Sequence, residues 1–418
     1  MASFTDTNGG GQLHPTLVAV KKISLVAGIG GLALWAVFFL IMPQAAWASY
    51  IFAYLFFFLL GIGGLLWLMI HHLTGGRWGF MIQRMLEAQT RTLPVLALLF
   101  LPIFLYMDMY PWMDLTRAKY IDIVESKLPY LNMTGYVYRW IAYWVIFIGL
   151  ATLLNRWSRL QDESGDPALS MRMMRLSAVG LVVSALAITF AAVDWTMSLE
   201  PEWFSSIYGL WYGVGGGLAT MALCIIILSF QRERAPLKKW YRTDHLHFLG
   251  NFMFGFTILW AYVSMSQFLI IWSANLPEEV PFYLNRNTGW LNAITVFLMI
   301  FHFALPFILL LQQKVKRTVG FVVGMAVWML LMRLLDVFWN IKPAFINDGF
   351  IWSTLWLDAI ALVGVGGIWL FAYLWQLDRR PLMVNDPRIF VAFSRDLSDH
   401  GHGGHIEPPA PEETPEHA

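Results

Sequence analysis

Charge is scarce in this chain of 418 residues. Asp, Glu, Lys and Arg together make up only 13% of it, whereas 58% of the residues are hydrophobic and the mean hydropathy is +0.58. A soluble domain covers its surface with charged side chains, and about 25% of its residues are charged. The composition therefore excludes an ordinary water-soluble protein and predicts an integral membrane protein.

Cysteine is nearly absent as well. The single Cys224 lies within an apolar stretch. One cysteine cannot form a disulfide within the chain, cannot ligate an iron–sulfur cluster alone and cannot build the C-x-x-C-H motif that attaches haem c. We therefore expect no such cofactor on this chain, and any redox centre with these ligands would belong to another chain.

Long hydrophobic runs take the place of charge. A run of roughly 18 to 25 residues crosses about 30 Å of hydrocarbon at about 1.5 Å per residue. Ten runs are predicted to span: 23–42, 49–70, 93–107, 136–154, 176–193, 204–230, 248–272, 290–311, 319–338 and 352–375. The third is short, contains two prolines, and can be interpreted as extending backwards through the amphipathic stretch 80–92. The sequence thus predicts an all-α membrane domain over residues 23–377.

Lysine and arginine favour one side of the predicted domain. About 21 of the 28 basic residues fall before residue 23 or after the even-numbered spans, and about five fall in the alternate loops. This bias predicts a multi-pass protein whose tails, residues 1–22 and 378–418, are both cytoplasmic. No cleavable signal peptide is visible, so we expect the first span to direct its own insertion.

The end of the chain is rich in Pro, Gly, Glu and His. The stretch H-G-H-G-G-H-I-E-P-P-A-P-E-E-T-P-E-H-A begins at His400. Such a composition cannot bury enough apolar surface to fold alone, so the tail is predicted to be partly disordered. His400, His402 and His405 could hold a metal ion, but plain disorder is the simpler hypothesis.

Glycines are grouped within four spans, where small residues let helix backbones approach closely. We interpret them as packing faces. The run Gly215 to Gly217 has no preceding strand and is not a nucleotide-binding loop. The four groups are Gly28, Gly30 and Gly31; Gly61, Gly63 and Gly64; Gly213, Gly215, Gly216 and Gly217; and Gly364, Gly366 and Gly367.

Ionisable side chains inside a span are costly unless they are paired or hydrated. Arg333 and Asp336 are spaced to share one face of the ninth span. Asp358 lies about 9 Å into the tenth span at 1.5 Å per residue, also in the external third. The external ends of the third, fourth and fifth spans carry Asp108, Arg139 and Asp194. Two hypotheses stay open: a hydrated cavity that takes up protons from outside, or ion pairs that lock helices together.

Histidines are the other candidate proton carriers. His302 falls near the middle of the eighth span. A histidine changes charge near neutral pH, so it suits a proton relay, but a buried packing histidine is the alternative. Four more lie near the cytoplasmic rim: His71, His72, His245 and His247. With Arg77 and Asp244 they could form the inner mouth of a proton path, or they could only anchor the helices at the interface.

Three motifs carry a family resemblance: H-H-L-T-G-G-R-W-G at 71–79, A-A-V-D-W-T-M-S-L-E-P-E-W-F-S-S-I-Y-G at 191–209 and N-L-P-E-E-V-P-F-Y at 275–283. With D-V-F-W at 336–339, they make the chain resemble the ActF family of membrane subunits of bacterial alternative complex III. That family belongs to the polysulfide-reductase membrane-subunit (NrfD-like) family. The likeness covers nearly the whole chain.

The resemblance implies two adjacent four-helix bundles with extra helices outside. It also implies a quinol oxidoreductase complex of the bacterial cytoplasmic (inner) membrane. Its haem c and iron–sulfur clusters would belong to partner subunits, namely a multihaem cytochrome c and an iron–sulfur protein, beside a second NrfD-like subunit that is the usual candidate for the quinol site. Quinone or menaquinone would be the substrate, and no nucleic acid is expected.

Three functions follow as hypotheses. In the first, this chain is a scaffold and proton path in a quinol:cytochrome c, or other acceptor, oxidoreductase, and carries no cofactor itself. In the second, it binds the quinol, and His302 or an external-face Asp accepts the protons. In the third, it is a secondary transporter, because polar groups near the midplane and glycine-broken helices also mark transporter substrate sites.

Overall fold

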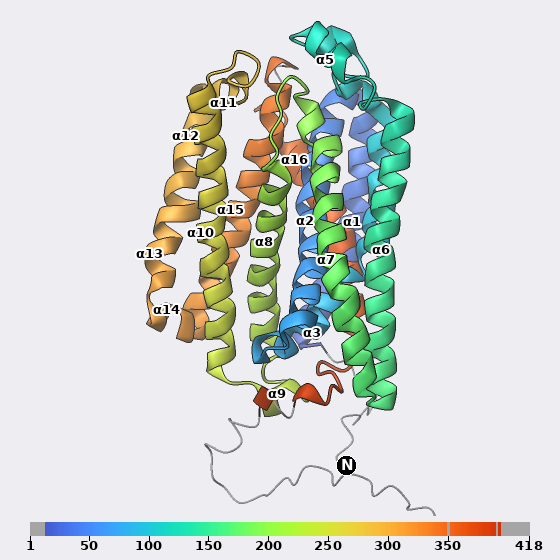
Figure 1. Cartoon of the computed structure of the whole chain (residues 1–418), viewed down its shortest axis with the longest axis vertical. Helices are drawn as coiled ribbons and strands as arrows, with labels where there is room; N and C mark the ends of the chain where they lie inside the picture. The colour runs from blue at the N-terminus through green and yellow to red at the C-terminus, as the bar shows by residue number, and fades with distance from the viewer. Residues whose placement is uncertain (1–12, 349–351, 390–391, 394–418) are drawn as a thin grey trace, which may run out of the picture.

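A computed structural model describes residues 13–348, 352–389 and 392–393 of the chain. Ten helical segments of this part are long and apolar enough to cross a membrane (Figure 1). They are α1 (Pro15–Ile41), α2 (Pro43–Thr74), α3 to η1 (α3 Arg77–Thr90, α4 Leu93–Phe100, η1 Leu101–Met109), α6 (Met133–Ser164), α7 (Pro167–Trp195), α8 (Tyr208–Gln231), α10 (Thr243–Ala274), α12 to α13 (α12 Gly289–Leu298, η4 Met299–Ala304, α13 Leu305–Leu311), α15 (Val319–Ile341) and α16 (Leu355–Leu377).

Short helices lie between these spans. At one end of the molecule, the upper end in Figure 1, are η2 (Leu115–Arg117), α5 (Ile121–Lys127), η3 (Met197–Leu199), α11 (Pro281–Arg286) and η5 (Lys342–Asp348). At the opposite end are α9 (Leu237–Trp240) and α14 (Gln313–Arg317). We call these the α5 end and the α9 end.

The predicted all-α fold with ten spans is confirmed, but most helices are longer than the hydrophobic runs. A helix continues until its backbone groups are capped rather than where its hydropathy falls. The first span begins at Pro15, where His14 accepts the Thr16 N–H, so residues predicted as tail are helical. The third reaches back to Arg77, as the amphipathic stretch had suggested. Gly75 and Gly165 end α2 and α6 in the left-handed conformation.

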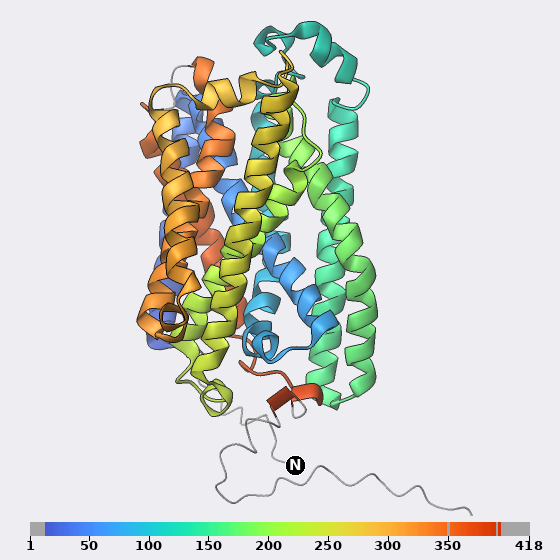
Figure 2. The ribbon, with the colours of Figure 1, turned by 60° about the vertical axis from the view of Figure 1, so that its left-hand side comes forward.

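The spans form two adjacent four-helix bundles. The first contains α2, the α3 to η1 span, α6 and α7, and the second contains α8, α10, the α12 to α13 span and α15. Helices α1 and α16 pack on each other and against α2, outside the first bundle. The most buried spans, α2 and α8, pack together where the bundles meet (Figures 1 and 2). This is the arrangement that the resemblance implied.

The glycine groups serve two purposes. A Cβ at Gly31 would lie 2.6 Å from the backbone N of Gly364, so these residues let α1 and α16 touch through their backbones. Gly63 and Gly216 do the same for α2 and α8. Here the packing interpretation holds. Gly215 instead makes room for a side chain, as described below, whereas a Cβ added at Gly30 or Gly213 would have no atom of the described residues within 4 Å.

Candidate functional site: two buried charged clusters

The first charged cluster lies in the first bundle, toward the α9 end, around Glu87 of α3. Glu87 is 1% exposed, and its carboxylate accepts hydrogen bonds from Arg84 Nη1 at 2.7 Å, Gln83 Nε2 at 3.0 Å and Ser158 Oγ of α6 at 2.5 Å. Gln83, Arg84 and Arg91 sit three or four positions from Glu87, which puts them on the same helix face. The amphipathic side of α3 is therefore turned into the bundle.

Further charged groups enclose this cluster. Arg84 also donates to Asp162 of α6 at 2.5 Å and to the carbonyl of Pro381 at 3.1 Å. Arg380, in the segment that follows α16, approaches Glu87 to 3.5 Å. Burying so many charges is costly unless they are paired, and each of these has an oppositely charged neighbour. We refer to Gln83, Arg84, Glu87, Arg91, Ser158, Asp162 and Arg380 as the Glu87 cluster.

None of these residues was among the sequence-derived candidates. The sequence does contain a signal for this cluster. Gln83, Glu87 and Arg91 recur every four residues, which places them on one helix face, and this stretch continues directly into the third hydrophobic run. The stretch was recognised as amphipathic, but its polar face is equally typical of a helix lying at the membrane surface. Only the packing of α2, α6 and the segment after α16 around α3 reveals that this face is buried.

His71 and His72 adjoin the Glu87 cluster. His71 Nε2 is 3.1 Å from Gln83 Oε1, and the Gln83 amide then donates to Glu87, which gives a hydrogen-bonded series from His71 to Glu87. The ring of His71 lies against Gly79, where a Cβ would collide with it. Both ring nitrogens of His72 are buried and lack a hydrogen-bond partner among the described residues. Two of the four rim histidines thus belong to one buried site.

The other two rim histidines lie in the second bundle. The backbone N–H of Arg242 donates to His245 Nδ1 at 2.9 Å, so His245 caps the start of α10. His247 is half-buried beside Phe248, and Asp244 is exposed and pairs with Arg317 at 3.5 Å. Arg77 lies over the ring of Phe248. The expected mouth is therefore divided between two bundles, and within the second bundle His245 has a capping role.

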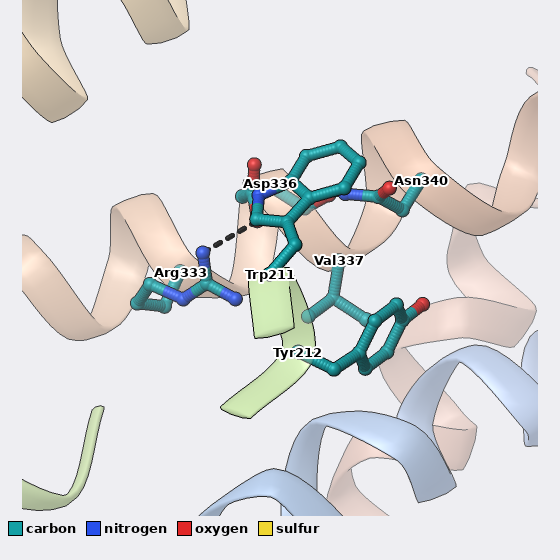
Figure 3. A pocket seen from close by; sticks show the side chains of 6 residues that line it. All are labelled: Trp211, Tyr212, Arg333, Asp336, Val337 and Asn340. Atoms are coloured by element: carbon teal, nitrogen blue, oxygen red, sulfur yellow. Dashed lines mark hydrogen bonds and ion pairs between the residues drawn. The ribbon is translucent and has the colours of Figure 1, made fainter. Parts of the chain in front are cut away.

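The second charged cluster lies in the second bundle, in the half toward the α5 end. Arg333 Nη1 donates to Asp336 Oδ2 at 2.5 Å, and both side chains are 2% exposed (Figure 3). They line a cavity of about 10 Å³ together with Trp211, Tyr212 and Asn340. Arg333 and Asp336 therefore face the bundle interior rather than acyl chains. We refer to Trp211, Tyr212, Arg333, Asp336 and Asn340 as the Asp336 cluster.

His302 is fully buried in the same bundle. It sits in the π-helical turn η4, an irregularity that is frequent at functional sites. Its ring centroid is 3.9 Å from that of Trp260, and neither ring nitrogen has a hydrogen-bond partner within the described ranges. The described histidines place no second imidazole ring against it. The geometry fits a histidine packed against an aromatic ring.

Arg139 and Asp194 form a two-pronged ion pair at the α5 end of the first bundle. Arg139 Nε and Nη2 donate to the two oxygens of Asp194 at 2.8 and 3.0 Å, and Tyr143 donates to Asp194 at 2.7 Å. Arg139 also lies 3.9 Å above the ring of Tyr130. Burial and the Asp194 carboxylate raise the pKa of Tyr130 to about 12, so the ring stays neutral below the cation. This pair joins α6 to α7.

Two more ion pairs lie at the α5 end. Lys342, at the start of η5, donates to Asp358 at 2.7 Å, and both side chains are buried. Arg286 is 1% exposed and pairs with Glu200 at 2.7 Å. Asp108, by contrast, is exposed on η1. Asp194, Asp336 and Asp358 each have a basic partner, but the structure does not bring the three pairs into one site.

Apolar layers separate the polar regions along each bundle. In the first bundle, Phe58, Phe100, Trp144 and Trp195 touch one another between the Glu87 cluster and Asp194. Asn155 of α6 accepts a hydrogen bond from Arg91 and so marks where the Glu87 cluster begins on this helix. The distance along α6 from Trp144 to Asn155 is about 16 Å at 1.5 Å per residue. In the second bundle, α15 turns Val322, Met325, Ala326 and Met329 inward on the α9 side of Arg333. The Glu87 cluster and the Asp336 cluster therefore lie toward opposite ends, on either side of the α2–α8 crossing.

The described part of the chain contains no group of three or more His, Cys, Asp or Glu side chains that could hold a metal ion. The tail histidines His400, His402 and His405 lie outside the described residues. Comparison of the sequence with models of protein families and with curated proteins finds no match.

Proposed function

We propose that this chain is a membrane subunit of a quinol:cytochrome c, or other acceptor, oxidoreductase complex, in which it serves as scaffold and proton path. The observation that carries the proposal is the placement of the Glu87 cluster toward the α9 end and the Asp336 cluster toward the α5 end. Groups that ionise inside a membrane protein are costly and mark ion or proton pathways.

The glycine crossing of α2 and α8 supports a connection between the two clusters. Gln89 of α3 packs on Gly64 of α2, and a Cβ at Gly64 would lie 2.6 Å from its Oε1 atom. On the far side of the crossing, the guanidinium group of Arg333 packs on Gly215 of α8. Both polar atoms of the Gln89 amide are buried without a hydrogen-bond partner among the described side chains and backbone. Polar groups therefore reach the crossing from both bundles.

The segments that carry the resemblance also support the proposal, because two of them form one packed unit. Trp203 stacks on Phe282 with ring centroids 4.0 Å apart, and the ion pair of Glu200 and Arg286 ties the same two loops together. Arg286 donates further to the carbonyl of Trp339, in the D-V-F-W segment. Haem c and iron–sulfur clusters would then lie on partner subunits, and quinol on this chain or on a second NrfD-like subunit.

The distribution of basic residues supports the proposed orientation. The segments rich in Lys and Arg all lie at the α9 end, together with Pro15 at the start of α1 and Leu377 at the end of α16. By the positive-inside rule this distribution supports an orientation with the α9 end on the cytoplasmic side. The family resemblance supports the bacterial cytoplasmic (inner) membrane. In this orientation the Glu87 cluster is the cytoplasmic one, and the Asp336 cluster is nearer the outside.

Two alternatives each have an observation in their favour. A quinol site on this chain is favoured by His302, whose ring nitrogens are unpaired within the part of the chain described. A secondary transporter is favoured by the two irregular spans, since the third changes to a 3-10 helix at Leu101 and the eighth contains the π-helical turn. Broken helices supply backbone groups for substrates in that class.

Purification distinguishes these functions. The chain, tagged at its native locus and extracted in a mild detergent, is expected to bring with it a protein that contains haem c and a protein that contains an iron–sulfur cluster. A chain that elutes alone, free of haem, would contradict the complex and support a transporter. Photo-crosslinking with an azidoquinone then distinguishes the two roles within the complex. Labelling on a partner subunit supports the role as scaffold and proton path, and labelling near His302 supports a quinol site on this chain.

A further inference from the structure

One lysine at the α9 end of the second bundle is buried without an acidic partner. Lys316 of α14 is only 7% exposed, and its Nζ atom has neither a hydrogen bond nor an ion pair with the described residues. Nζ lies 5.3 Å from the ring centroid of Phe254 of α10. A cation–π contact leaves the three N–H donors of an ammonium group without acceptors. Because lysines are almost never this buried unless they are paired, we expect an anion beside Lys316.

The fold holds Lys316 in this position. Its side chain lies across Gly250 of α10, where a Cβ would be 3.1 Å from Lys316 Cγ and 3.4 Å from Cδ. A glycine at position 250 therefore leaves room for the lysine stem. A lysine near the end of a span usually extends toward water, away from the apolar region. Lys316 packs on α10 instead, so its charge stays at the edge of the hydrocarbon.

The charge around Lys316 is mainly positive. Lys314 and Arg317 of the same short helix are exposed, and His247 of α10 lies near both Lys316 and Arg317. The carboxylate that the described residues place against this group is that of Asp244, which pairs with Arg317 at 3.5 Å. Three cations thus share one carboxylate. Such an excess of positive charge favours a ligand with a net negative charge over a zwitterion.

Apolar side chains flank the basic helix. Helix α14 connects α13 to α15 at the periphery of the second bundle (Figures 1 and 2). These two spans expose Ile308, Leu311 and Phe321 close to α14, each between 59% and 61% exposed. In a bilayer these side chains meet acyl chains, and α14 lies at the level of the headgroups. Basic pockets beside membrane-spanning helices are sites where anionic headgroups bind.

We propose that Lys316 binds the phosphate of one anionic phospholipid in the leaflet at the α9 end. Lys314 and Arg317 add positive charge, and the acyl chains lie on α13 and α15. A lipid suits this place better than free phosphate, because the apolar side chains next to α14 contact its chains while Lys316 contacts its headgroup. The proposal concerns the bilayer around the chain and is independent of the proposed redox function.

Native mass spectrometry of the delipidated protein, with its co-purifying partners, tests this site. Phosphatidylglycerol and phosphatidylcholine are titrated separately against the natural protein and Lys316→Met, which keeps a long unbranched side chain and removes the charge. We expect the dissociation constant of the tightest phosphatidylglycerol site to rise about fivefold in Lys316→Met, and that of phosphatidylcholine to stay the same. Lys238→Met, which changes an exposed lysine at the same end, is the matched control and should alter neither constant.

Three results would overturn the proposal: an unchanged constant for phosphatidylglycerol in Lys316→Met, an equal loss in Lys238→Met, or an equal loss of both lipids. A cryo-EM structure of the natural protein in nanodiscs that contain phosphatidylglycerol covers the case in which Lys316→Met does not fold. We expect a lipid phosphate whose oxygen lies about 2.7 to 2.9 Å from Lys316 Nζ. A partner subunit seated on α14, or ordered lipids elsewhere and none at Lys316, would contradict the assignment.

Discussion

Arg139 and Asp194 are 55 positions apart in the sequence and meet only because α6 packs on α7. The sequence predicted both residues as candidates, since charges at the ends of spans are conspicuous, but it could not predict that they pair. The pair of Arg333 and Asp336 was predictable, because a spacing of three places two side chains on one helix face. Partners on different helices depend on the rotation of each helix, which hydropathy does not encode.

Removing Arg139 tests how much the ion pair stabilises the first bundle. Asp194 is fully buried, so Arg139→Ala leaves an uncompensated charge in the interior. We expect the free energy of unfolding to fall by about 3 kcal/mol, the low end of the range for breaking a buried pair, because Arg139 is partly exposed. Thermal unfolding in detergent measures the loss.

The exposed pair of Arg159 and Glu163 on the same helix is the control. Arg159→Ala should change the stability by no more than about 0.5 kcal/mol. The double variant Arg139→Ala, Asp194→Asn should recover part of the loss, since it removes the buried charge as well. Equal effects of Arg139→Ala and Arg159→Ala would show that the Asp194 pair is not structurally important.

At the level of whole helices, the number of spans was predictable and their bounds were not. Ten hydrophobic runs gave ten spans, because backbone groups in lipid must be satisfied within a helix. The polar ends of the helices were not predicted. Helix α1 includes Lys21 and Lys22, which were assigned to the tail, and α3 has a buried polar face around Glu87. The π-helical turn at His302 also leaves no hydropathy signal. The Glu87 cluster and the helix bounds were missed for one reason: both lie in polar stretches next to the hydrophobic runs, where hydropathy gives no sign of a span.

The glycine contact between α1 and α16 predicts a difference between two neighbouring residues. Gly31→Leu should separate the two helices, because its side chain would meet the backbone of Gly364, whereas Gly30→Leu points into open space. We expect the first change to destabilise the protein by about 1 to 3 kcal/mol, as overpacking usually does, and the second to have little effect. Differential scanning fluorimetry of both variants compares them, and equal midpoints would contradict this packing.

For the whole molecule, the chain folds into two bundles joined at α2 and α8, and its basic segments gather at the α9 end. The bundles themselves followed from the resemblance rather than from hydropathy, which says nothing about which helices are neighbours. Their meeting at a glycine crossing gives the proposed path its geometry, because each bundle alone is interrupted by an apolar layer.

Cysteine labelling tests the orientation. The native Cys224 is fully buried, so the background reaction with a membrane-impermeant maleimide should be low. Ser126→Cys on α5 and Lys238→Cys on α9 are exposed positions at opposite ends. The first should react in intact spheroplasts and the second only in inverted membrane vesicles. The reverse pattern would place the α9 end outside and contradict the charge argument.

The most direct test of the account is the number of protons released per quinol oxidised by the purified complex in proteoliposomes, for the natural protein, Glu87→Gln and Asp336→Asn. The exposed Asp122→Asn serves as the control variant and should leave the ratio unchanged. We predict that each of the two buried variants lowers this ratio while the haem content stays the same, because each removes an ionisable group from the proposed path. Ratios equal to that of the natural protein, at full turnover in both variants, would contradict the account.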